Sequence, residues 1–255
     1  GYEFPKQSSM DIEHVLSISH ATLSDLVRQT SFAVRKEDLR PIFTGLLFEV
    51  NGSDLTVVGT DSFRLALMHD KIINEAGGEV KVVIPVRALN EVIGIFEEDS
   101  IIHLSITKNQ ILFESGDVQI TSQLLKGEFP PYKAAIPKSH STHFAIKRGE
   151  LKSSIERATL FGRDNQGTTV VRLHLESGLL TIKTASERGH VDEKLPIFME
   201  GDDVNILFNA NFLTDALTKI HYDDLDVEMS GDLGPCIFRP KNDDRYLYLL
   251  LPLRQ

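Results

Sequence analysis

An internal repeat limits the fold of this chain more than any other feature. Residues 44–58 read TGLLFEVNGSDLTVV and residues 169–183 read TVVRLHLESGLLTIK, so a short turn separates two apolar stretches in both segments. The tripeptide Glu-Phe-Pro also occurs twice, at residues 3–5 and 128–130, with the same displacement of 125 residues. Two separate features that share one displacement predict two tandem domains of about 125 residues.

The repeated tripeptide also suggests where the domains begin and end. Residues 128–130 close one repeat and lead into the next, so residues 3–5 are expected to close a preceding repeat. We predict the tail of an earlier domain at residues 1–5, a central domain at 6–127 and a C-terminal domain at 128–255. The chain is then expected to be a fragment whose missing first domain has roughly 120 residues.

Each predicted domain divides again into two half-units that share one plan. Apolar residues recur at helical spacing near residues 23–34, 86–97, 150–161 and 211–221. Short stretches of alternating apolar and polar residues, bounded by turn residues, come after these helices. The predicted fold class is α+β, with tandem domains that each pack two helices on antiparallel sheets.

Composition excludes several classes of protein. Apolar residues make up 41% of the chain, enough to bury sizeable cores, but no run of about 18 apolar residues could span a membrane. One cysteine, Cys236, excludes an internal disulfide and favours the reducing cytoplasm. The formal charge of −10 argues against simple electrostatic adhesion to nucleic acid.

Motifs for catalysis are missing from the sequence. There is no phosphate-binding or dinucleotide-binding glycine motif and no nucleophile-elbow motif. The only histidine cluster, His140 and His143, has no cysteine or carboxylate at ligand spacing, so a polar linker is the better interpretation. Cys236 lies in an apolar strand, where a buried and inert thiol is expected. We therefore expect no catalytic residue, no metal and no cofactor.

Four short segments, in this order and spacing, carry a family resemblance. They are RPIFTG at residues 40–45, TDSFRLA at 60–66, the EFP junction at 128–130 and LLLPLR at 249–254. Together they make essentially the whole chain resemble the bacterial sliding clamp, the beta subunit of DNA polymerase III. Ser62-Phe63 departs from the Gly-His or Ser-His that is usual in this family.

The resemblance implies a fold, a function and partners. Family members have three clamp domains per chain, and two chains join head to tail in a ring around duplex DNA. The ring slides on DNA as a processivity factor and tethers the DNA polymerase III alpha subunit, the clamp loader and other proteins with clamp-binding motifs. Full-length chains are thus expected to form a homodimer, and a fragment without the first domain is expected to be monomeric.

The resemblance also implies a hydrophobic groove for short peptides, partly built by the C-terminal segment. From the residues alone, this segment is equally well interpreted as a buried last strand, although Pro252 favours a strand end. Ala134 and Ala135 replace the larger arginine and valine of some relatives, which suggests a roomier pocket floor. The implied groove residues are Arg40, Phe43, Thr60, Ser62, Phe63, Arg64, Leu65, Pro130, Ala134, Ala135, Asn209, Phe212, Pro235, Leu249, Leu250, Leu251, Pro252, Leu253 and Arg254.

Two more sites are expected on or near the helices. The polar helix faces carry basic residues that could contact DNA, namely Arg28, Arg87, Lys152, Arg157 and Lys219. Any single one of them is more often simply solvated, but an encircling ring needs only weak contacts with phosphates. Leu160 and Phe161 match apolar residues at the ring contact of the family, and a core role for one of them is equally well supported.

Two alternative functions compete with the clamp. The first is a peptide-binding scaffold without a role on DNA, and the second is an enzyme that uses a carboxylate cluster. Only a clamp predicts that the full-length protein stays on circular DNA and slides off after linearisation. An enzyme predicts turnover that is lost when one carboxylate is substituted.

Overall fold

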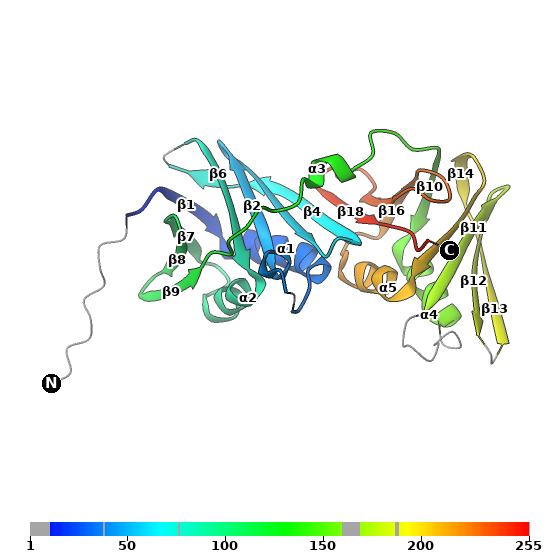
Figure 1. Cartoon of the computed structure of the whole chain (residues 1–255), viewed down its shortest axis with the longest axis horizontal. Helices are drawn as coiled ribbons and strands as arrows, with labels where there is room; N and C mark the ends of the chain where they lie inside the picture. Colours follow the sequence, from blue (N-terminus) through cyan, green and yellow to red (C-terminus); the bar gives the residue numbers. More distant parts are fainter. Residues whose placement is uncertain (1–10, 38, 76, 160–168, 187–188, 255) are drawn as a thin grey trace. The chain divides into compact units, whose positions relative to one another are not determined.

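The structure is a computed structural model that describes residues 11–37, 39–75, 77–159, 169–186 and 189–254 (Figure 1). The chain separates into two compact units. The first unit comprises Gly1–Ser31, Lys36–Val58 and His69–Phe129. The second unit comprises Phe32–Arg35, Gly59–Met68 and Pro130–Gln255, so it takes two short segments from the first half of the sequence.

The first half of the chain forms strands, helices and two short 3-10 turns. In chain order these are β1 (His14–Ser19), α1 (His20–Thr30), η1 (Ser31–Ala33), η2 (Pro41–Thr44), β2 (Gly45–Asn51), β3 (Asp54–Thr60), β4 (Arg64–Lys71), β5 (Ile73–Asn74), β6 (Glu79–Pro85), α2 (Val86–Ile95), β7 (Ile101–Ile106), β8 (Gln110–Ser115) and β9 (Val118–Gln123).

The second half begins with a short helix. Its elements are α3 (Tyr132–Ala135), β10 (Thr142–Lys147), α4 (Arg148–Thr159), β11 (Val170–Glu176), β12 (Leu179–Ser186), β13 (Gly189–Pro196), β14 (Phe198–Gly201), β15 (Val204–Asn209), α5 (Ala210–Lys219), β16 (Asp224–Met229), β17 (Cys236–Pro240) and β18 (Tyr246–Leu250).

The two halves repeat one topology. The strand order β5-β1-β7-β8-β9 of the first half returns as β14-β10-β16-β17-β18, and β4-β3-β2-β6 returns as β13-β12-β11-β15. Strands β2, β3 and β4 begin 125 residues before β11, β12 and β13. Pairing is antiparallel in both halves, as between β1 and β7 and between β11 and β12. The predicted α+β fold, with two helices and antiparallel sheets in each repeat, is confirmed.

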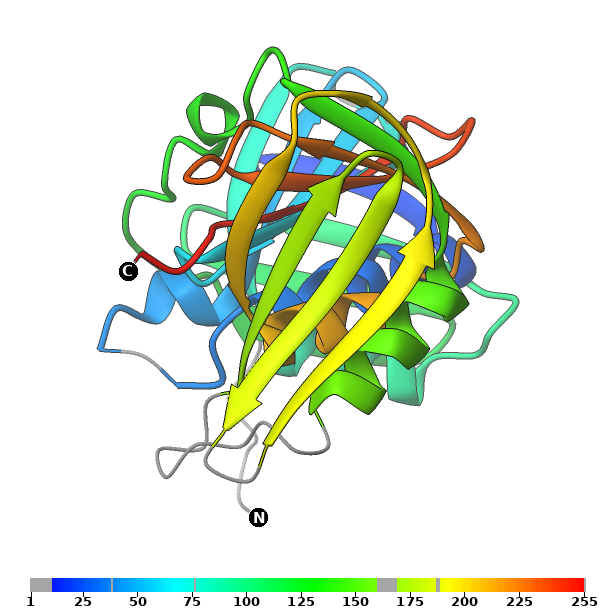
Figure 2. The same cartoon turned by 90° about the vertical axis from the view of Figure 1, so that its right-hand side faces the viewer.

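Two apolar helices cover the sheets in each repeat. Figure 2 looks onto the sheet β13-β12-β11-β15 of the second unit, with α4 and α5 behind it. Leu151 and Ile155 of α4 and Leu213 and Leu217 of α5 are almost completely buried. The helices match the apolar spacing seen in the sequence, because the buried positions recur every three or four residues.

The first helix begins earlier than its apolar residues suggest. It was expected near residues 23–34, but α1 spans His20–Thr30. The Ser19 side chain accepts a hydrogen bond from the Thr22 backbone N–H at 3.1 Å and so caps the first turn. The expectation missed this cap because periodicity marks the buried face of a helix and not its ends.

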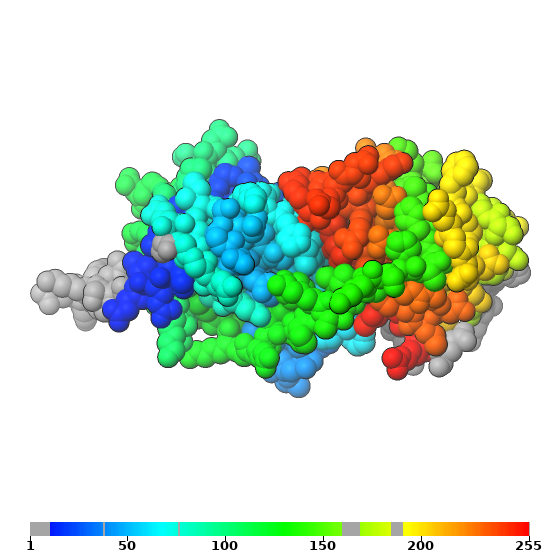
Figure 3. Space-filling model, turned by 90° about the horizontal axis from the view of Figure 1, so that it is seen from above, coloured from blue at the N-terminus to red at the C-terminus, as the bar shows by residue number. Residues whose placement is uncertain are grey.

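The tight turn between β11 and β12 shows why the repeat is readable in the sequence. Ser177 and Gly178 both have positive φ, 51° and 79°. Such a two-residue turn matches the twist of the flanking strands and fixes their register, in which Glu176 faces Leu179. Figure 3 shows the neighbouring strand β13 (yellow) at the surface of the second unit.

Candidate functional site

The second unit contains an apolar pocket with a volume of about 400 Å³. Three segments build it: the tip of the β3–β4 hairpin, residues 130–135, and the end of β18. The lining residues are Thr60, Ser62, Phe63, Arg64, Leu65, Pro130, Pro131, Tyr132, Ala134, Ala135, Leu249 and Leu251. Segments far apart in the sequence therefore meet at one concave surface of the kind that binds ligands.

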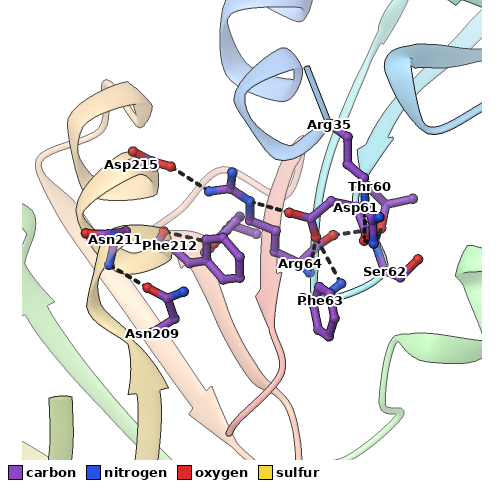
Figure 4. Close-up of polar contacts among 11 residues, drawn as sticks. Arg35, Thr60, Asp61, Ser62, Phe63, Arg64, Asn209, Asn211, Phe212 and Asp215 are labelled. Atoms are coloured by element: carbon purple, nitrogen blue, oxygen red, sulfur yellow. Dashed lines mark hydrogen bonds and ion pairs between the residues drawn. The ribbon is translucent and has the colours of Figure 1, made fainter. Parts of the chain in front are cut away.

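Side chains at the hairpin tip hold its backbone in a fixed turn (Figure 4). The Thr60 hydroxyl donates to the Arg64 carbonyl at 2.7 Å and accepts from the Ser62 N–H at 3.1 Å. One oxygen of Asp61 accepts from the Phe63 and Arg64 N–H groups at 2.9 and 3.0 Å. Ser62 takes a positive φ of 79° in this turn. The Phe63 side chain is left 55% exposed at the pocket rim.

Arg64 is a buried cation held by two carboxylates. Its Nε lies 3.0 Å from Asp61 Oδ2, and its Nη1 lies 2.8 Å from Asp215 Oδ2 on α5. The guanidinium also lies 4.3 Å from the centre of the Phe212 ring. Burial alone lowers the pKa of Arg64, but the hydrogen bond to Asp215 and the nearby negative charges raise it overall. The side chain is therefore charged, and it joins the hairpin tip to α5.

The C-terminal segment changes from buried to exposed at one residue. Leu249 and Leu250 are 2% and 0% exposed in β18, which pairs with β17 and with residues 64–68 of β4. Leu251 is 39% exposed, and its N–H donates to the Phe63 carbonyl at 2.9 Å. Leu253 N–H donates to the Leu207 carbonyl at 2.8 Å. The burial of Leu249 and Leu250 fits a buried last strand, and the exposure of Leu251 marks the end of that strand. The role of this segment in a peptide groove stays a prediction.

Several expected groove residues of the second unit do not line the pocket. Leu250 is fully buried, and Phe212 accepts a hydrogen bond from the Tyr248 hydroxyl at 3.0 Å through its carbonyl. Asn209 accepts from the Asn211 N–H at 3.0 Å and caps α5. The other residues of the second unit that were expected in the groove and lie outside the pocket lining are Pro235, Pro252, Leu253 and Arg254.

Arg40 and Phe43 belong to the first unit. The Arg40 guanidinium lies 4.5 Å from the centre of the Phe43 ring, and Phe43 is only 4% exposed. Their expected role in the groove stays a prediction.

Sequence reasoning missed Pro131 and Tyr132 in the pocket wall. Tyr132 is 5% exposed and begins α3, and Ala134 and Ala135 come after it as exposed, small residues. The pair of prolines at 130 and 131 was a usable signal, since two fixed φ angles present the next residues in a set direction.

The five basic residues expected to face DNA are on the helices, but most have an acidic neighbour. Arg28 pairs with Asp25, and Arg87 pairs with Glu91. Lys152 lies 3.5 Å from Glu156, and Arg157 lies 2.8 Å from Glu193. Lys219 is in the last turn of α5. Leu160 and Phe161, expected at a ring contact, lie outside the described residues.

Side chains suited to metal binding or thiol chemistry are scarce in the described part of the chain. Those residues contain no group of three or more histidine, cysteine or acidic side chains that could hold a metal ion. Cys236 is buried, and this burial raises the pKa of its thiol well above the ordinary value. None of the described helices is both long and apolar enough to cross a membrane.

Comparison with known proteins gives two matches to family models and many similar proteins. Residues 17–131 match the central domain of the DNA polymerase III beta subunit, and residues 133–254 match its C-terminal domain. The beta sliding clamp of Staphylococcus epidermidis is 31% identical over 99% of this chain and 67% of its own length. That of Halalkalibacterium halodurans is 31% identical over 99% of this chain and 68% of its own length.

Solved structures agree with the sequence comparison. The sliding clamp of Bacillus subtilis has a TM-score of 0.92 and 32% identity, with 99% of this chain and 67% of that chain covered. The sliding clamp of Pseudomonas aeruginosa, solved bound to griselimycin, has a TM-score of 0.91 and 26% identity over 99% and 68%. The resemblance read from the sequence is confirmed. The chain therefore belongs to the family of beta sliding clamps, the beta subunits of DNA polymerase III.

Proposed function

We propose that the apolar pocket of the second unit is the site at which this sliding clamp holds DNA polymerase and other proteins with clamp-binding motifs. As a beta sliding clamp, the chain serves DNA replication as a non-catalytic processivity factor. Processivity requires that a partner is held near the primer end, because tethering raises its local concentration. A short peptide docked in a pocket supplies such a tether.

The observation that carries this proposal is the make-up of the pocket wall. Leu65, Leu249 and Pro130 offer apolar atoms, while Phe63 and Leu251 stand partly exposed at the rim. Exposed apolar residues around a hollow of about 400 Å³ mark a site that gains from covering by an apolar partner. The clamp of Pseudomonas aeruginosa was solved with a bound ligand, griselimycin, so a protein of this fold can take a ligand.

Ala134 and Ala135 support a preference for bulky anchors in this pocket. Both side chains end at Cβ and both line the hollow. A larger apolar side chain of the partner therefore meets no obstacle at these positions. We expect partner peptides with larger C-terminal apolar residues to keep their affinity.

The helices support a second part of the proposal, that duplex DNA passes through a ring of full-length chains in the cytoplasm. Arg28, Arg87, Lys152, Arg157 and Lys219 lie on α1, α2, α4 and α5. Neighbouring carboxylates offset part of the positive charge of Arg28, Arg87 and Lys152. We therefore expect weak, salt-sensitive contacts with phosphates, which suit a ring that slides and is loaded by a clamp loader.

The peptide site is tested by substituting one rim leucine. Binding of a labelled peptide with the clamp-binding motif of the DNA polymerase III alpha subunit is measured by fluorescence anisotropy. Leu251→Ala is expected to raise the Kd roughly tenfold or more, because it removes exposed apolar surface at the pocket that a bound peptide would cover. Leu233→Ala is the matched control, since Leu233 is 79% exposed in the same unit and does not line the pocket.

Equal Kd values for the two variants and the unchanged chain would contradict the proposed site. A second series uses peptides with progressively larger C-terminal apolar residues. A steep loss of affinity along this series would contradict the roomy floor at Ala134 and Ala135, and would leave the site itself in place.

A further inference from the structure

A second hollow, with a volume of about 430 Å³, lies entirely within the first unit. Its walls are strand β6, Leu47 of β2, Lys108 in the turn between β7 and β8, and residues 124–129 after β9. Figure 1 shows this last segment (green) running beside β6. The hollow shares no lining residue with the apolar pocket of the second unit.

Three lysines surround this hollow, which we call the lysine pocket. Lys81, Lys108 and Lys126 are all exposed, and among the described residues none of them has an ion pair. Glu128 brings a carboxylate to the same lining. This local excess of positive charge stands in a chain whose formal charge is −10. The lysine pocket therefore favours a ligand with negative charges.

The inner wall of the lysine pocket is apolar. Val83, Leu124 and Phe129 line it and are 6%, 9% and 5% exposed, and Leu47 is fully buried. A ligand that matches both parts of the surface has an apolar group between acidic groups. An extended segment has this pattern when an acidic, an apolar and an acidic residue follow at every second position, because alternate side chains of a strand point to the same face, as Lys81 and Val83 of β6 do.

The backbone of β6 offers pairing positions to such a segment. β6 is the last strand of the order β4-β3-β2-β6, and β2 is its only strand partner among the described residues. The Val83 carbonyl accepts the Leu125 N–H at 2.9 Å, so the backbone groups of Val83 point away from β2. In an antiparallel pair these directions alternate, so the N–H and C=O of Lys81 also point away from β2. An edge of this kind can accept another strand.

We propose that the lysine pocket binds an acidic, extended peptide segment of a partner protein. The segment pairs with the outer edge of β6 at Lys81 and places its carboxylates beside Lys81, Lys108 and Lys126. Its apolar residue covers the wall formed by Val83, Leu124 and Phe129. A nucleic acid could meet the lysines, but it has no backbone N–H and C=O pattern that pairs with a strand edge.

Binding of a fluorescein-labelled peptide, Glu-Ser-Val-Ser-Glu-Ser, to the whole chain tests this proposal, since its Glu, Val and Glu side chains share one face. The triple variant Lys81→Gln, Lys108→Gln, Lys126→Gln is expected to raise its Kd at least tenfold, which corresponds to about 1.4 kcal/mol. The control variant Lys183→Gln, Lys194→Gln, Lys241→Gln changes the net charge equally at exposed residues of the second unit. It is expected to leave the Kd within about twofold.

Three further measurements separate the alternatives. Leu251→Ala should bind this probe normally, because its side chain belongs to the other pocket. A probe N-methylated at every residue should bind at least tenfold more weakly, since it cannot donate to the edge of β6. Equal Kd values for the two triple variants, or undiminished binding of the methylated probe, would overturn the proposal. So would an oligothymidylate that binds the lysine pocket more tightly than the peptide does.

Discussion

Arg64 lies at the centre of the polar contacts beside the apolar pocket. The sequence motif suggested that it lines a groove, and it does contribute to the lining. Most of the guanidinium is nevertheless turned to Asp61 and Asp215, and the side chain is only 8% exposed. Removing the cation would leave Asp61, which is equally buried, without its charge partner. The residue therefore supports the hairpin tip in addition to lining the pocket.

Arg64→Met is expected to lower the free energy of unfolding by about 3 kcal/mol, in the range for breaking a buried ion pair. Chemical denaturation measures this loss. Asp215→Asn is the control at the other end of the contact. Asp215 is half exposed, and asparagine can still accept the hydrogen bond, so a loss below about 1 kcal/mol is expected. Similar losses of unfolding free energy for the two variants would show that the buried charge of Asp61 does not cause the loss expected for Arg64→Met.

The partner of Arg64 also shows what sequence reasoning could not supply. Asp61 is three residues away and belongs to the same motif, but Asp215 lies 151 residues later on α5. No local pattern marks Asp215 among the many acidic residues of the chain. Ser62 is similar, because its positive φ results from the hydrogen bonds of the turn and not from a residue type that favours such angles.

At the scale of the elements, an ion pair between Arg157 and Glu193 links helix α4 to strand β13. Arg157 Nη2 and Nε donate to the two carboxylate oxygens of Glu193 at 2.8 and 3.1 Å. These hydrogen bonds lower the pKa of Glu193 and raise the pKa of Arg157. Arg157 was expected to face DNA, and the adjacent carboxylate offsets much of the charge that it could present there.

The Glu193 carboxyl is expected to titrate below the ordinary range for glutamate. Because its pKa is lowered in the folded chain, the pair stabilises the fold above the pKa of the unfolded state. That contribution is lost as the pH falls through the folded pKa. NMR titration of the side-chain carboxyl measures it, and Arg157→Gln should raise the pKa towards its ordinary value. The control Arg28→Gln, in the other unit, should leave it unchanged.

Most helices and hairpins could be predicted from the sequence. The repeat, its hairpins and the apolar faces of α2 and α5 are marked by period and turn residues, which are local signals. Sheet order was not readable, because pairing between β1 and β7 joins residues far apart in the chain. The lysine pocket was not foreseen for the same reason, since Lys81 of β6, Lys108 between β7 and β8, and Lys126 after β9 line one hollow only in the folded chain.

At the scale of the whole molecule, encirclement and adhesion predict different behaviour on DNA. The full-length gene product, loaded on circular duplex DNA and separated by gel filtration, is expected to stay with the DNA at moderate salt. Linearising the circle should release it, because only topology holds a ring whose contacts with phosphates are weak. Retention on the linear form as well would favour direct adhesion. Failure to bind either form would favour a scaffold without a role on DNA.

The second unit is built from separate stretches of the sequence, and this matters when the gene is divided. Residues 59–68 are distant in sequence from residues 130–255, yet they supply one wall of the apolar pocket and the strand that pairs with β18. A gene split between codons 129 and 130 would place the two walls on separate polypeptides. Ligand capture would then report on reassembly of the halves, which makes this junction a natural position for a split-protein sensor.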